Sequence, residues 1–526
     1  MVYLLSFLAC IGFTFFLEAF FKPYYASLLK RRLRGLLITM SLVLITQAFF
    51  LLVTHRPMFS VVSTLIMVSV LLAVNNAKYA ALREPLVFSD LFLYLQAIRY
   101  PRLYFPFLGL PALILLPIVF VSVIYFGFAL EQSVFNQVLI YSLLLVVVIG
   151  LAIIALLKLA AAAVISGDLE TDIKRFGILS TFCIYATLAS SERETLALSL
   201  LSMSRFRVST DKEIVKKQDG TQLPDIIAVQ SESFFDARKV SETIKKNVLS
   251  HYDQCLLTSF QHGALSVPAW GANTMRTEFA FLTGYTPDAL GLARFYPYHQ
   301  LLKMNKPQSL IAYLKQLGYY CICIHPHDAG FFLRDQFFKK LGFDEFMDEA
   351  SFENPDRVGP YISDAEVCQK IIRTSCQQRN DQPLFIFAIT MENHGPLHLE
   401  SVGESEWEQY FEKRTEAKDD DLTVYLRHLN NADAMIDGLT SFYKQSEKQV
   451  GLVFYGDHVP AISKTFDHYG YADDRSNYFI WNNYLDRKNV VGKAGRQFDT
   501  QDIKVEDLAL TLLSSLNLSP QCHNKL

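Results

Sequence analysis

The sequence predicts two regions of different fold class, an N-terminal α-helical transmembrane bundle and a C-terminal α/β/α domain. Long apolar runs fill the first third of the 526 residues. In the second half, four short apolar runs each end at residues that can bind metal or phosphate. A composition that is 51% hydrophobic is also high for a wholly soluble protein.

The first third contains five runs that are long enough, or nearly so, to cross a bilayer as helices. They cover residues 3–21, 36–53, 61–74, 105–130 and 138–165. The run 61–74 is the weakest, because its core is short and it carries Ser and Thr. No basic segment precedes the first run and more runs follow, so we expect an uncleaved anchor rather than a secretory signal peptide. We predict five spans; residues 176–190 would form either an interfacial helix, which we favour, or a sixth span.

These patterns predict a transmembrane domain over 1–165, interfacial helices and a linker over 166–222, and the α/β/α domain over 223–526. The loop after the first run carries five basic residues, and the positive-inside rule favours a cytoplasmic loop with the N-terminus outside. They are Lys22, Lys30, Arg31, Arg32 and Arg34. Five crossings would then leave the second domain in the cytoplasm and six would leave it outside, so the sequence itself leaves the side open.

Charge and cysteine usage exclude some classes of function. The formal net charge is −3, and no basic and aromatic surface pattern indicates a nucleic-acid partner. The eight Cys form no CxxC pair, so we expect them to be structural.

The four apolar runs of the second half are typical of strands buried on both faces. Residues 225–230 lead into Glu232, 320–324 into His325, 383–390 into His394, and 451–456 into Asp457 and His458. In open α/β sheets, ligands collect beyond the carboxyl ends of such strands. The four polar ends together predict a site, although His394 could merely cap a strand and Asp457-His458 could be a strand-end turn.

The turn Gly271-Ala-Asn before a helix-compatible segment would place Thr274 near a helix N-terminus, where free N–H groups favour an anion. A threonine at such a position, taken alone, is more often an N-cap. With Glu232, Asp457 and His458, it forms a set of hard ligands suited to Mn²⁺ or Mg²⁺. Such a set can activate a hydroxyl nucleophile and neutralise a phosphoryl group.

At these residues the chain resembles a known family, and the resemblance covers roughly residues 223–516. The motifs are Ser231-Glu-Ser-Phe, Gly271-Ala-Asn-Thr-Met-Arg-Thr-Glu-Phe, His325 with Arg334-Asp335, Asn393-His394 and Tyr455-Gly-Asp-His. They resemble the successive motifs of lipoteichoic acid synthases and related phosphoglycerol transferases, in the alkaline phosphatase and sulfatase superfamily. The resemblance implies a sulfatase-like domain behind a multi-span anchor.

The resemblance also implies roles for single residues. Glu232, Thr274, Asp457 and His458 would bind the metal, with Thr274 also the nucleophile. His325, Arg334 and His394 would surround the transferred headgroup, and His394 could act as acid or base. Two departures concern that headgroup pocket: His327 stands where the synthases have an acidic residue and Phe332 where they have a Trp.

The function implied is that of a bacterial inner-membrane enzyme with an extracytoplasmic catalytic domain. It would move phosphoglycerol from phosphatidylglycerol to a hydroxyl of an envelope glycan or polymer. Asn393-His394-Gly395-Pro396 also resembles phosphoethanolamine transferases, which leaves that headgroup as an alternative, and a catalytically silent membrane scaffold is a third reading. Between the third and fourth spans, Lys78 and Arg83 could touch lipid headgroups or simply anchor the loop.

Overall fold

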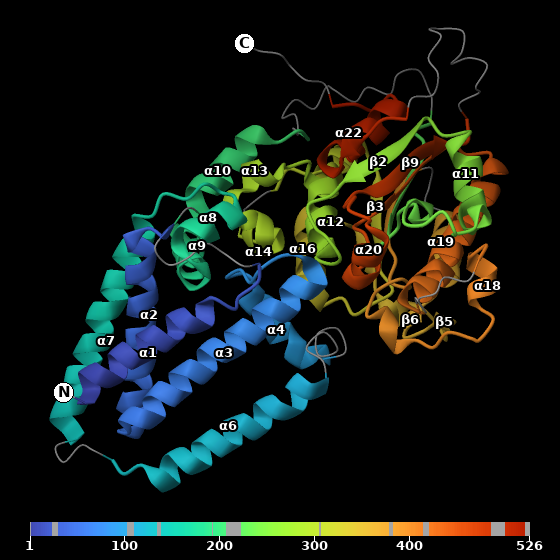
Figure 1. Cartoon of the computed structure of the whole chain (residues 1–526). Helices are drawn as coiled ribbons and strands as arrows, with labels where there is room; N and C mark the ends of the chain where they lie inside the picture. The colour runs from blue at the N-terminus through green and yellow to red at the C-terminus, as the bar shows by residue number, and fades with distance from the viewer. Residues whose placement is uncertain are drawn as a thin grey trace. The chain divides into compact units, whose positions relative to one another are not determined.

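A computed structural model describes residues 2–23, 30–101, 110–133, 138–191, 193–206, 222–303, 307–377, 382–413, 420–484 and 500–520. The chain forms two compact units, Met1–Glu194 and Thr195–Leu526 (Figure 1). The division falls inside the segment 166–222, for which interfacial helices and a linker are predicted.

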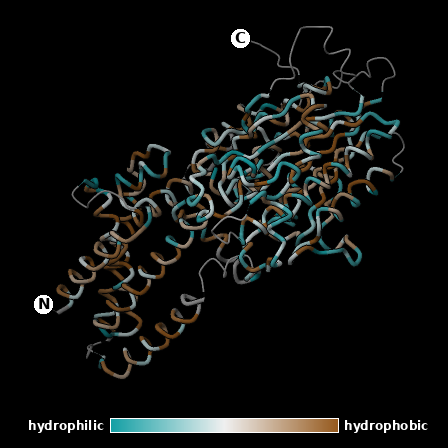
Figure 2. The backbone as a smooth tube through the Cα atoms, turned by 45° about the vertical axis from the view of Figure 1, so that its right-hand side comes forward, coloured by the Kyte–Doolittle hydropathy of each residue, from teal (hydrophilic) through white to brown (hydrophobic). Residues whose placement is uncertain are grey.

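Helices are the only regular secondary structure among the described residues of the first unit. Its helices are α1 Val2–Glu18, α2 Leu33–Thr54, α3 Pro57–Leu82, α4 Asp90–Arg99, α6 Leu110–Leu130, α7 Val138–Ala161, α8 Leu169–Phe176 and α9 Ile178–Ser191; α10 Arg193–Met203 follows. Among the described residues, Leu33–Thr54, Pro57–Leu82 and Leu139–Ala161 are long and apolar enough to cross a membrane. Tyr3–Glu18, Pro117–Leu130 and Ile178–Ser190 are shorter apolar helices. The apolar residues run along these helices (Figure 2), so this is a membrane protein; the count of five spans stays a prediction.

Helix α3 is longer than the apolar run that predicts it, and two of its hydroxyl groups are hydrogen-bonded inside the helix. Ser60 Oγ donates to the carbonyl of Pro57 at 2.7 Å, and Thr64 Oγ1 donates to the carbonyl of Ser60 at 2.8 Å. A hydroxyl bonded in this way offers no unpaired polar group to lipid. The predicted run 61–74 lies inside this 26-residue helix, which is long and apolar enough to cross a membrane.

An eight-stranded mixed sheet forms the centre of the second unit, in the order β10-β2-β9-β8-β1-β7-β3-β4. The strands are β1 Asp225–Ser231, β2 Gln261–Ser266, β3 Tyr320–Ile324, β4 Glu345–Met347, β7 Leu384–Ile389, β8 Val450–Gly456, β9 Ser476–Asn482 and β10 Ile503–Lys504; β5 Arg357–Val358 and β6 Tyr361–Ile362 form a separate hairpin. The four predicted strands β8, β1, β7 and β3 are neighbours and run parallel, so their polar ends meet at one edge. Only β9 runs antiparallel to its neighbours β8 and β2.

Helices cover both faces of this sheet (Figure 1), which confirms the predicted α/β/α architecture. One layer contains α11 Ser250–Leu256, α17 Asp364–Ser375 and α19 Asp420–Lys444; the other contains α12 Thr274–Thr283, α15 Leu310–Gln316, α16 Arg334–Leu341 and α22 Val505–Ser515. Ile227 of β1 shares a core with Leu429 of α19. On the opposite face, the ring of Phe281 in α12 lies 5.7 Å from that of Phe387 in β7 and 5.0 Å from that of Tyr455 in β8.

Candidate active site and metal centre

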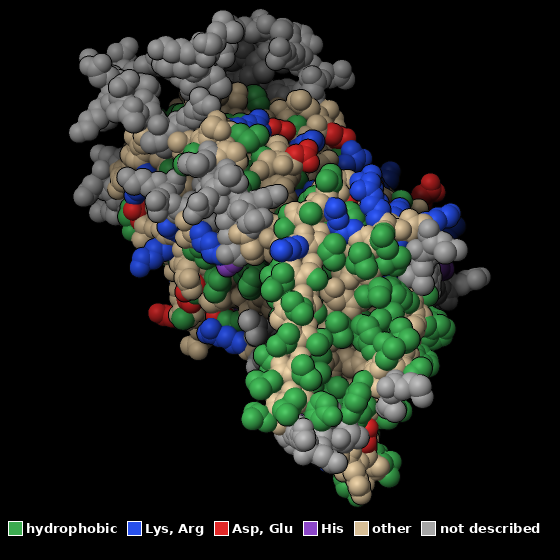
Figure 3. All heavy atoms as spheres, turned by 90° about the vertical axis from the view of Figure 1, so that its left-hand side faces the viewer, with side chains coloured by type: hydrophobic (Ala, Val, Ile, Leu, Met, Phe, Trp, Pro, Cys, Tyr) green, Lys and Arg blue, Asp and Glu red, His purple; other side chains and the backbone are tan. Residues whose placement is uncertain are grey.

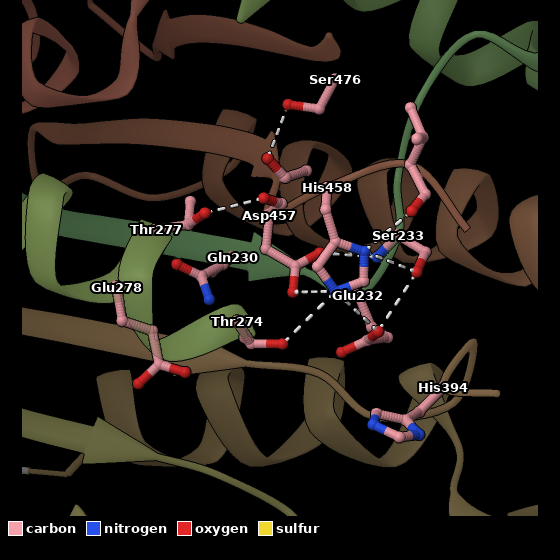
Figure 4. A network of polar contacts seen from close by, with 12 residues as sticks. Gln230, Glu232, Ser233, Thr274, Thr277, Glu278, His394, Asp457, His458 and Ser476 are labelled. Atoms are coloured by element: carbon pink, nitrogen blue, oxygen red, sulfur yellow. Dashed lines mark hydrogen bonds and ion pairs between the residues drawn. The ribbon is translucent and has the colours of Figure 1, made fainter. Parts of the chain in front are cut away.

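The ends of β1 and β8 and the start of α12 bring four of the predicted site residues together (Figure 4). Glu232, Asp457 and His458 each offer a ligand atom, and these atoms lie within 4.8 Å of one another. The hydroxyl of Thr274 lies 3.5 Å from Nε2 of His458. All four side chains are buried. The candidate metal ligands are therefore adjacent in space although they come from three distant segments.

Close backbone packing holds the two strand ends against each other. A Cβ atom at Gly456 would lie 1.9 Å from the carbonyl oxygen of Phe234, so only glycine permits this approach. Ser233 has a φ of 55°, in the left-handed region that is unfavourable for serine. Its backbone N–H donates to Oδ1 of Asp457 at 2.8 Å. This unfavourable conformation thus fixes one carboxylate oxygen of the site.

The hydrogen bonds of His458 determine which ring nitrogen is free. Nδ1 lies 3.0 Å from the carbonyl oxygen of Val459, which can only accept, so Nδ1 carries the proton. In the neutral ring Nε2 then holds a lone pair, and it lies 3.3 Å from Oδ2 of Asp457 and 3.6 Å from Oε1 of Glu232. A backbone carbonyl that fixes the tautomer in this way is typical of a metal-binding histidine.

The charge balance of the cluster fits a divalent cation. Oδ2 of Asp457 is buried without a hydrogen-bond partner. Burial, and next the neighbouring Asp457 carboxylate, raise the pKa of Glu232 well above its usual range. Two buried carboxylates this close repel each other unless a cation lies between them. With one imidazole and a hydroxyl, the donors are of the kind that suits Mn²⁺ or Mg²⁺.

Thr274 is the first residue of α12, as the sequence predicts for a residue near a helix N-terminus. Asn273, with a φ of 65°, occupies the N-cap position and makes no side-chain cap. The Thr274 hydroxyl is directed at His458 rather than at the backbone of its own helix. The N-cap interpretation of Thr274 is therefore wrong: Asn273 holds the N-cap position, and the Thr274 hydroxyl lies at the first turn of the helix.

His325 and Arg334 contact each other in a second buried cluster that also contains Glu278 and Tyr298. Nη1 of Arg334 lies 3.1 Å from Nε2 of His325, and Nε of Arg334 donates to Oε2 of Glu278 at 3.1 Å. Nη2 of Arg334 donates to Oε1 of Glu278, which makes the ion pair bidentate. The hydroxyl of Tyr298 donates to the same carboxylate. We call this the Glu278–Arg334 network.

The Glu278–Arg334 network also sets the state of His325. A guanidinium only donates, so Nε2 of His325 accepts and the ring is neutral with its proton on Nδ1. Burial, and next the charge of Arg334, lower the pKa of His325 well below its usual range. Glu278 lies one turn after Thr274 on α12 (Figure 4), so one helix carries both the candidate nucleophile and the partner of Arg334.

His394 follows β7 and is partly buried. Its Nδ1 lies 2.7 Å from the carbonyl oxygen of Gly395 and 3.3 Å from the hydroxyl of Tyr361. The carbonyl requires a proton on Nδ1, which leaves Nε2 as the acceptor. Burial lowers the pKa of His394 to about 4, so the ring is neutral near pH 7. A neutral imidazole with a free Nε2 can take a proton from a hydroxyl.

A third network lies next to the His394 loop. His428 of α19 places Nδ1 3.1 Å from Oε1 of Glu392 and Nε2 3.1 Å from Oε1 of Glu400. Glu392 also accepts from the backbone N–H of Asp364 at 2.7 Å and from the side chain of Asn431 at 2.6 Å. The residue two positions before His394 is thus tied to α17 and α19. This arrangement holds the loop in one conformation.

The two departures from the synthase motifs lie on one aromatic surface beside Arg334. The ring of Phe331 lies 5.3 Å from that of His327 and 4.1 Å from that of Phe332. The guanidinium of Arg334 lies 5.1 Å from the centre of the Phe332 ring. Phe332 therefore still presents an aromatic face to Arg334, whereas His327 supplies no carboxylate.

Sequence reasoning gave no role to Ser233, Glu278, Tyr298, Tyr361 or His428. One signal was available for Glu278, because residues four apart on a helix share a face and Thr274 was already a candidate. Tyr298 and His428 carry no comparable signal, since their partners come from distant parts of the chain. The hydrogen bond between His428 and Glu392 spans 36 residues, for example.

This fold and site define a protein of the alkaline phosphatase superfamily with a helical membrane region. Residues 224–518 match the family described as sulfatase, and the chain belongs to that family. It is 27% identical over 450 residues to the capsular polysaccharide biosynthesis protein RkpI of Rhizobium meliloti, covering 82% of this chain and 79% of that protein.

Two further similarities concern the motifs and the fold. The chain is 28% identical over 163 residues to lipoteichoic acid synthase 1 of Bacillus subtilis, covering 29% of this chain and 24% of the synthase, which confirms the resemblance read from the motifs. The integral membrane protein lipooligosaccharide phosphoethanolamine transferase A of Neisseria meningitidis has a similar fold, with 12% identity, a TM-score of 0.52 and 88% of each chain covered.

Proposed function

We propose that the protein transfers phosphoglycerol from phosphatidylglycerol to a hydroxyl of an envelope glycan or polymer. The observation that carries this proposal is the Thr274 hydroxyl, which lies at a helix N-terminus 3.5 Å from Nε2 of His458, in a cluster with two buried carboxylates. A hydroxyl nucleophile, a site for a cation and free N–H groups are the parts that phosphoryl transfer requires.

The reaction divides into two displacements at phosphorus. In the first, Oγ1 of Thr274 forms a bond to the phosphorus of the donor lipid, and the bond from phosphorus to the diacylglycerol oxygen breaks. The Thr274 proton is released and the diacylglycerol oxygen takes one up. In the second, the acceptor oxygen bonds to phosphorus and the bond from phosphorus to Oγ1 of Thr274 breaks; Nε2 of His394 takes the acceptor proton, and Oγ1 takes up a proton to restore the hydroxyl.

Glu232, Thr274, Asp457 and His458 would hold the metal, Mn²⁺ or Mg²⁺. When bound, such an ion lowers the pKa of a coordinated hydroxyl and neutralises phosphoryl charge. The chain's own contribution is orientation: the Val459 carbonyl fixes the His458 ring and the Ser233 N–H fixes the Asp457 carboxylate. The Glu278–Arg334 network orients Arg334 toward the headgroup site; Arg334 lowers and Glu278 raises the pKa of Glu232, so the pair adds little net charge to the metal-ligand cluster.

The names of two relatives support an envelope glycan as acceptor. One is the capsular polysaccharide biosynthesis protein RkpI already described. Another, 26% identical over 291 residues, is named a putative cyclic beta-1,2-glucan modification protein of Rhizobium meliloti. Both names concern glycans, whose hydroxyls are the nucleophiles that the second displacement needs.

Phosphoethanolamine is the second candidate headgroup, and the observation that favours it is the Asn393-His394-Gly395-Pro396 motif. One assay distinguishes the phosphoglycerol transferase, the phosphoethanolamine transferase and the silent scaffold. Full-length protein is incubated with phosphatidylglycerol or phosphatidylethanolamine, each labelled in its headgroup, and the mass of the Thr274 peptide is determined. A phosphoglycerol adduct on Thr274 supports the proposal, a phosphoethanolamine adduct supports the alternative, and no adduct from either donor supports a scaffold.

We further propose that the protein lies in the bacterial inner membrane with its catalytic domain outside the cytoplasm, where phosphatidylglycerol would serve polymer chemistry. A reporter that is active only in the periplasm, fused after Leu526, tests on which side of the membrane the catalytic domain lies. Reporter activity in an intact, inserted fusion is expected. Silence of such a fusion would mean a cytoplasmic catalytic domain and would exclude the proposed acceptors.

A further inference from the structure

The helical unit has one strongly basic end. Three contacts bring helix ends together there: Arg34 donates to the carbonyl of Ala162 just after α7, Arg32 N–H donates to the carbonyl of Arg175 in α8, and Lys22 N–H donates to the side chain of Asn76 in α3. The end of α1, the start of α2, the last turns of α3 and α7, and α8 therefore meet.

The described residues of this basic end carry more bases than acids. The bases are Lys22, Lys30, Arg31, Arg32, Arg34, Lys78, Arg83, Lys158, Lys174 and Arg175, and the acids are Glu18, Glu84, Asp90, Asp168, Glu170 and Asp172. Ten bases minus six acids leave a surplus of four positive charges. At the opposite end, where the Glu131 carboxylate accepts from the N–H groups of Met58 and Phe59, Arg56 balances Glu131.

The acids of the basic end are engaged inside the unit. Glu18 pairs with Arg31, while Glu84 and Asp90 both pair with Lys78. Lys78 also donates to the carbonyl of Pro85, so the structure makes it an internal anchor of its loop rather than a free headgroup contact. Of the remaining acids, Asp168 caps α8 and Glu170 pairs with Lys174. Asp172 accepts from the N–H of Ser166 and the hydroxyl of Tyr185.

Several cations therefore have no carboxylate partner among the described residues. Lys22, Lys30, Arg32 and Lys158 are exposed, and Arg34 and Arg175 are partly exposed. Figure 3 shows Lys and Arg side chains gathered beyond one end of the apolar helical surface. A surplus of unpaired cations on one rim creates a positive potential that attracts anions.

Exposed apolar side chains directly beside these cations indicate which class of anion the cations bind. Leu33 is 70% exposed between Arg32 and Arg34, and Leu157 is 47% exposed next to Lys158. Cations that alternate with exposed leucines match the boundary where lipid phosphates meet acyl chains. A soluble anion would need only the charges and would gain nothing from the leucines.

We propose that the basic end of the helical unit binds the headgroups of anionic phospholipids and concentrates the donor lipid around the enzyme. The concentrating role rests on the proposed function, whereas the binding of anionic lipid does not. The positive-inside rule offers another cause for such charges, namely orientation during insertion, so binding has to be measured directly.

The first experiment measures lipid retention. Full-length protein is released from bilayers of equal phosphatidylglycerol and phosphatidylcholine content, and retained lipids are counted by native mass spectrometry. We expect phosphatidylglycerol to predominate at low salt and less so at high salt. In K30Q/R32Q/K158Q the ratio of the two lipids should fall about tenfold or more, since one cation near an anionic surface is worth about fivefold in binding. K246Q/K464Q/K504Q removes equal charge from the second unit and should leave the ratio unchanged.

The second experiment measures transfer against the mole fraction of phosphatidylglycerol in vesicles. K30Q/R32Q/K158Q should need a several-fold higher fraction for half its maximal rate, with an unchanged maximal rate. An unchanged lipid ratio in this variant, or an equal loss in the control variant, would overturn the proposed surface. If the ratio of retained lipids changes but neither protein transfers phosphoglycerol, the lipid-binding surface is supported and the proposed function is contradicted. A changed ratio with identical vesicle kinetics would refute the concentrating role alone.

Discussion

The metal-ligand cluster and the Glu278–Arg334 network are both buried at the same edge of the sheet, yet only one of them balances its own charge. Arg334 and Glu278 form a bidentate pair, and Tyr298 and His325 complete their hydrogen bonds. Glu232 and Asp457 repel each other, and Oδ2 of Asp457 has no hydrogen-bond partner. A self-balanced network orients residues, whereas an unbalanced one requires a cation. This difference predicts that substitutions in the two clusters will have different consequences.

Thr274→Ala should have the largest effect on activity, because the hydroxyl is the proposed nucleophile. We expect turnover to fall on the order of a thousandfold or more, as when other covalent nucleophiles are removed. Stability should change by less than about 2 kcal/mol, since one hydroxyl is lost without any loss of core packing. Steady-state transfer and thermal unfolding of the full-length protein test both parts. Thr274→Ser retains a hydroxyl and should keep part of the activity; equal turnover by wild type and Thr274→Ala would refute the assignment.

Asp457→Ala should break the unbalanced cluster in a different way, by weakening metal binding. We expect the affinity for Mn²⁺ to fall by more than about a hundredfold, because even outer-shell partners of a metal site contribute 10–100-fold. Saturating Mn²⁺ should stabilise the wild type by about 2.7 kcal/mol at a hundred times its Kd and should leave the variant unaffected. Isothermal titration and thermal unfolding after chelation measure these changes. A wild type that binds no divalent ion would contradict the metal site.

Glu278→Gln tests the self-balanced network. We expect kcat/KM to fall on the order of a hundredfold and unfolding to become easier by about 3–5 kcal/mol, since Arg334 would be left as an uncompensated buried charge. Metal affinity should remain within a few-fold, because Glu278 is not a ligand. Asp433→Asn, which weakens a buried carboxylate that accepts from His251 and Tyr252, provides a control for lost stability alone. If Glu278→Gln lost metal as Asp457→Ala does, the two clusters would not be separate.

Many residues of the two clusters could be predicted from the sequence, because they lie close in sequence to recognisable strands. Three of the four strands end directly before a functional residue, and β7 ends five positions before His394, so His325 or Asp457 is marked by the apolar run before it. The pairing of Arg334 is not marked: Glu278 lies four residues after Thr274, but nothing in the sequence links it to Arg334, 56 residues away, and Tyr298 is on a short helix with no motif. The hydroxyl groups of the predicted span 61–74 do not prevent a membrane-length helix, because Thr64 bonds to the backbone of its own helix. Thr181 and Thr187 of α9 do the same, so polar composition alone does not decide whether 176–190 spans the membrane.

His428→Gln should have the smallest effect, confined to the pH dependence of stability. Both ring nitrogens of His428 face carboxylate oxygens, which only accept, so the ring is an imidazolium. Burial opposes this charge, but the hydrogen bonds from His428 to Glu392 and Glu400 raise its pKa to about 9. Because the folded pKa exceeds the unfolded value of about 6.5, the stabilisation is fully present below pH 6.5 and is lost as the pH rises through 9.

The rise of the pKa from 6.5 to about 9 sets an upper bound of roughly 3.5 kcal/mol for this contribution, since a tenfold change in proton affinity corresponds to about 1.4 kcal/mol. Unfolding measured at pH 6 and pH 9.5 should therefore show the wild type losing more stability with rising pH than His428→Gln does. Exposed His468 offers a matched control, since His468→Gln should retain the wild-type slope. Metal affinity should be unchanged in both variants, because His428 lies outside the metal-ligand cluster. A His428→Gln variant with the same pH slope as the wild type would mean that the ring is neutral and that Glu392 or Glu400 carries the proton instead.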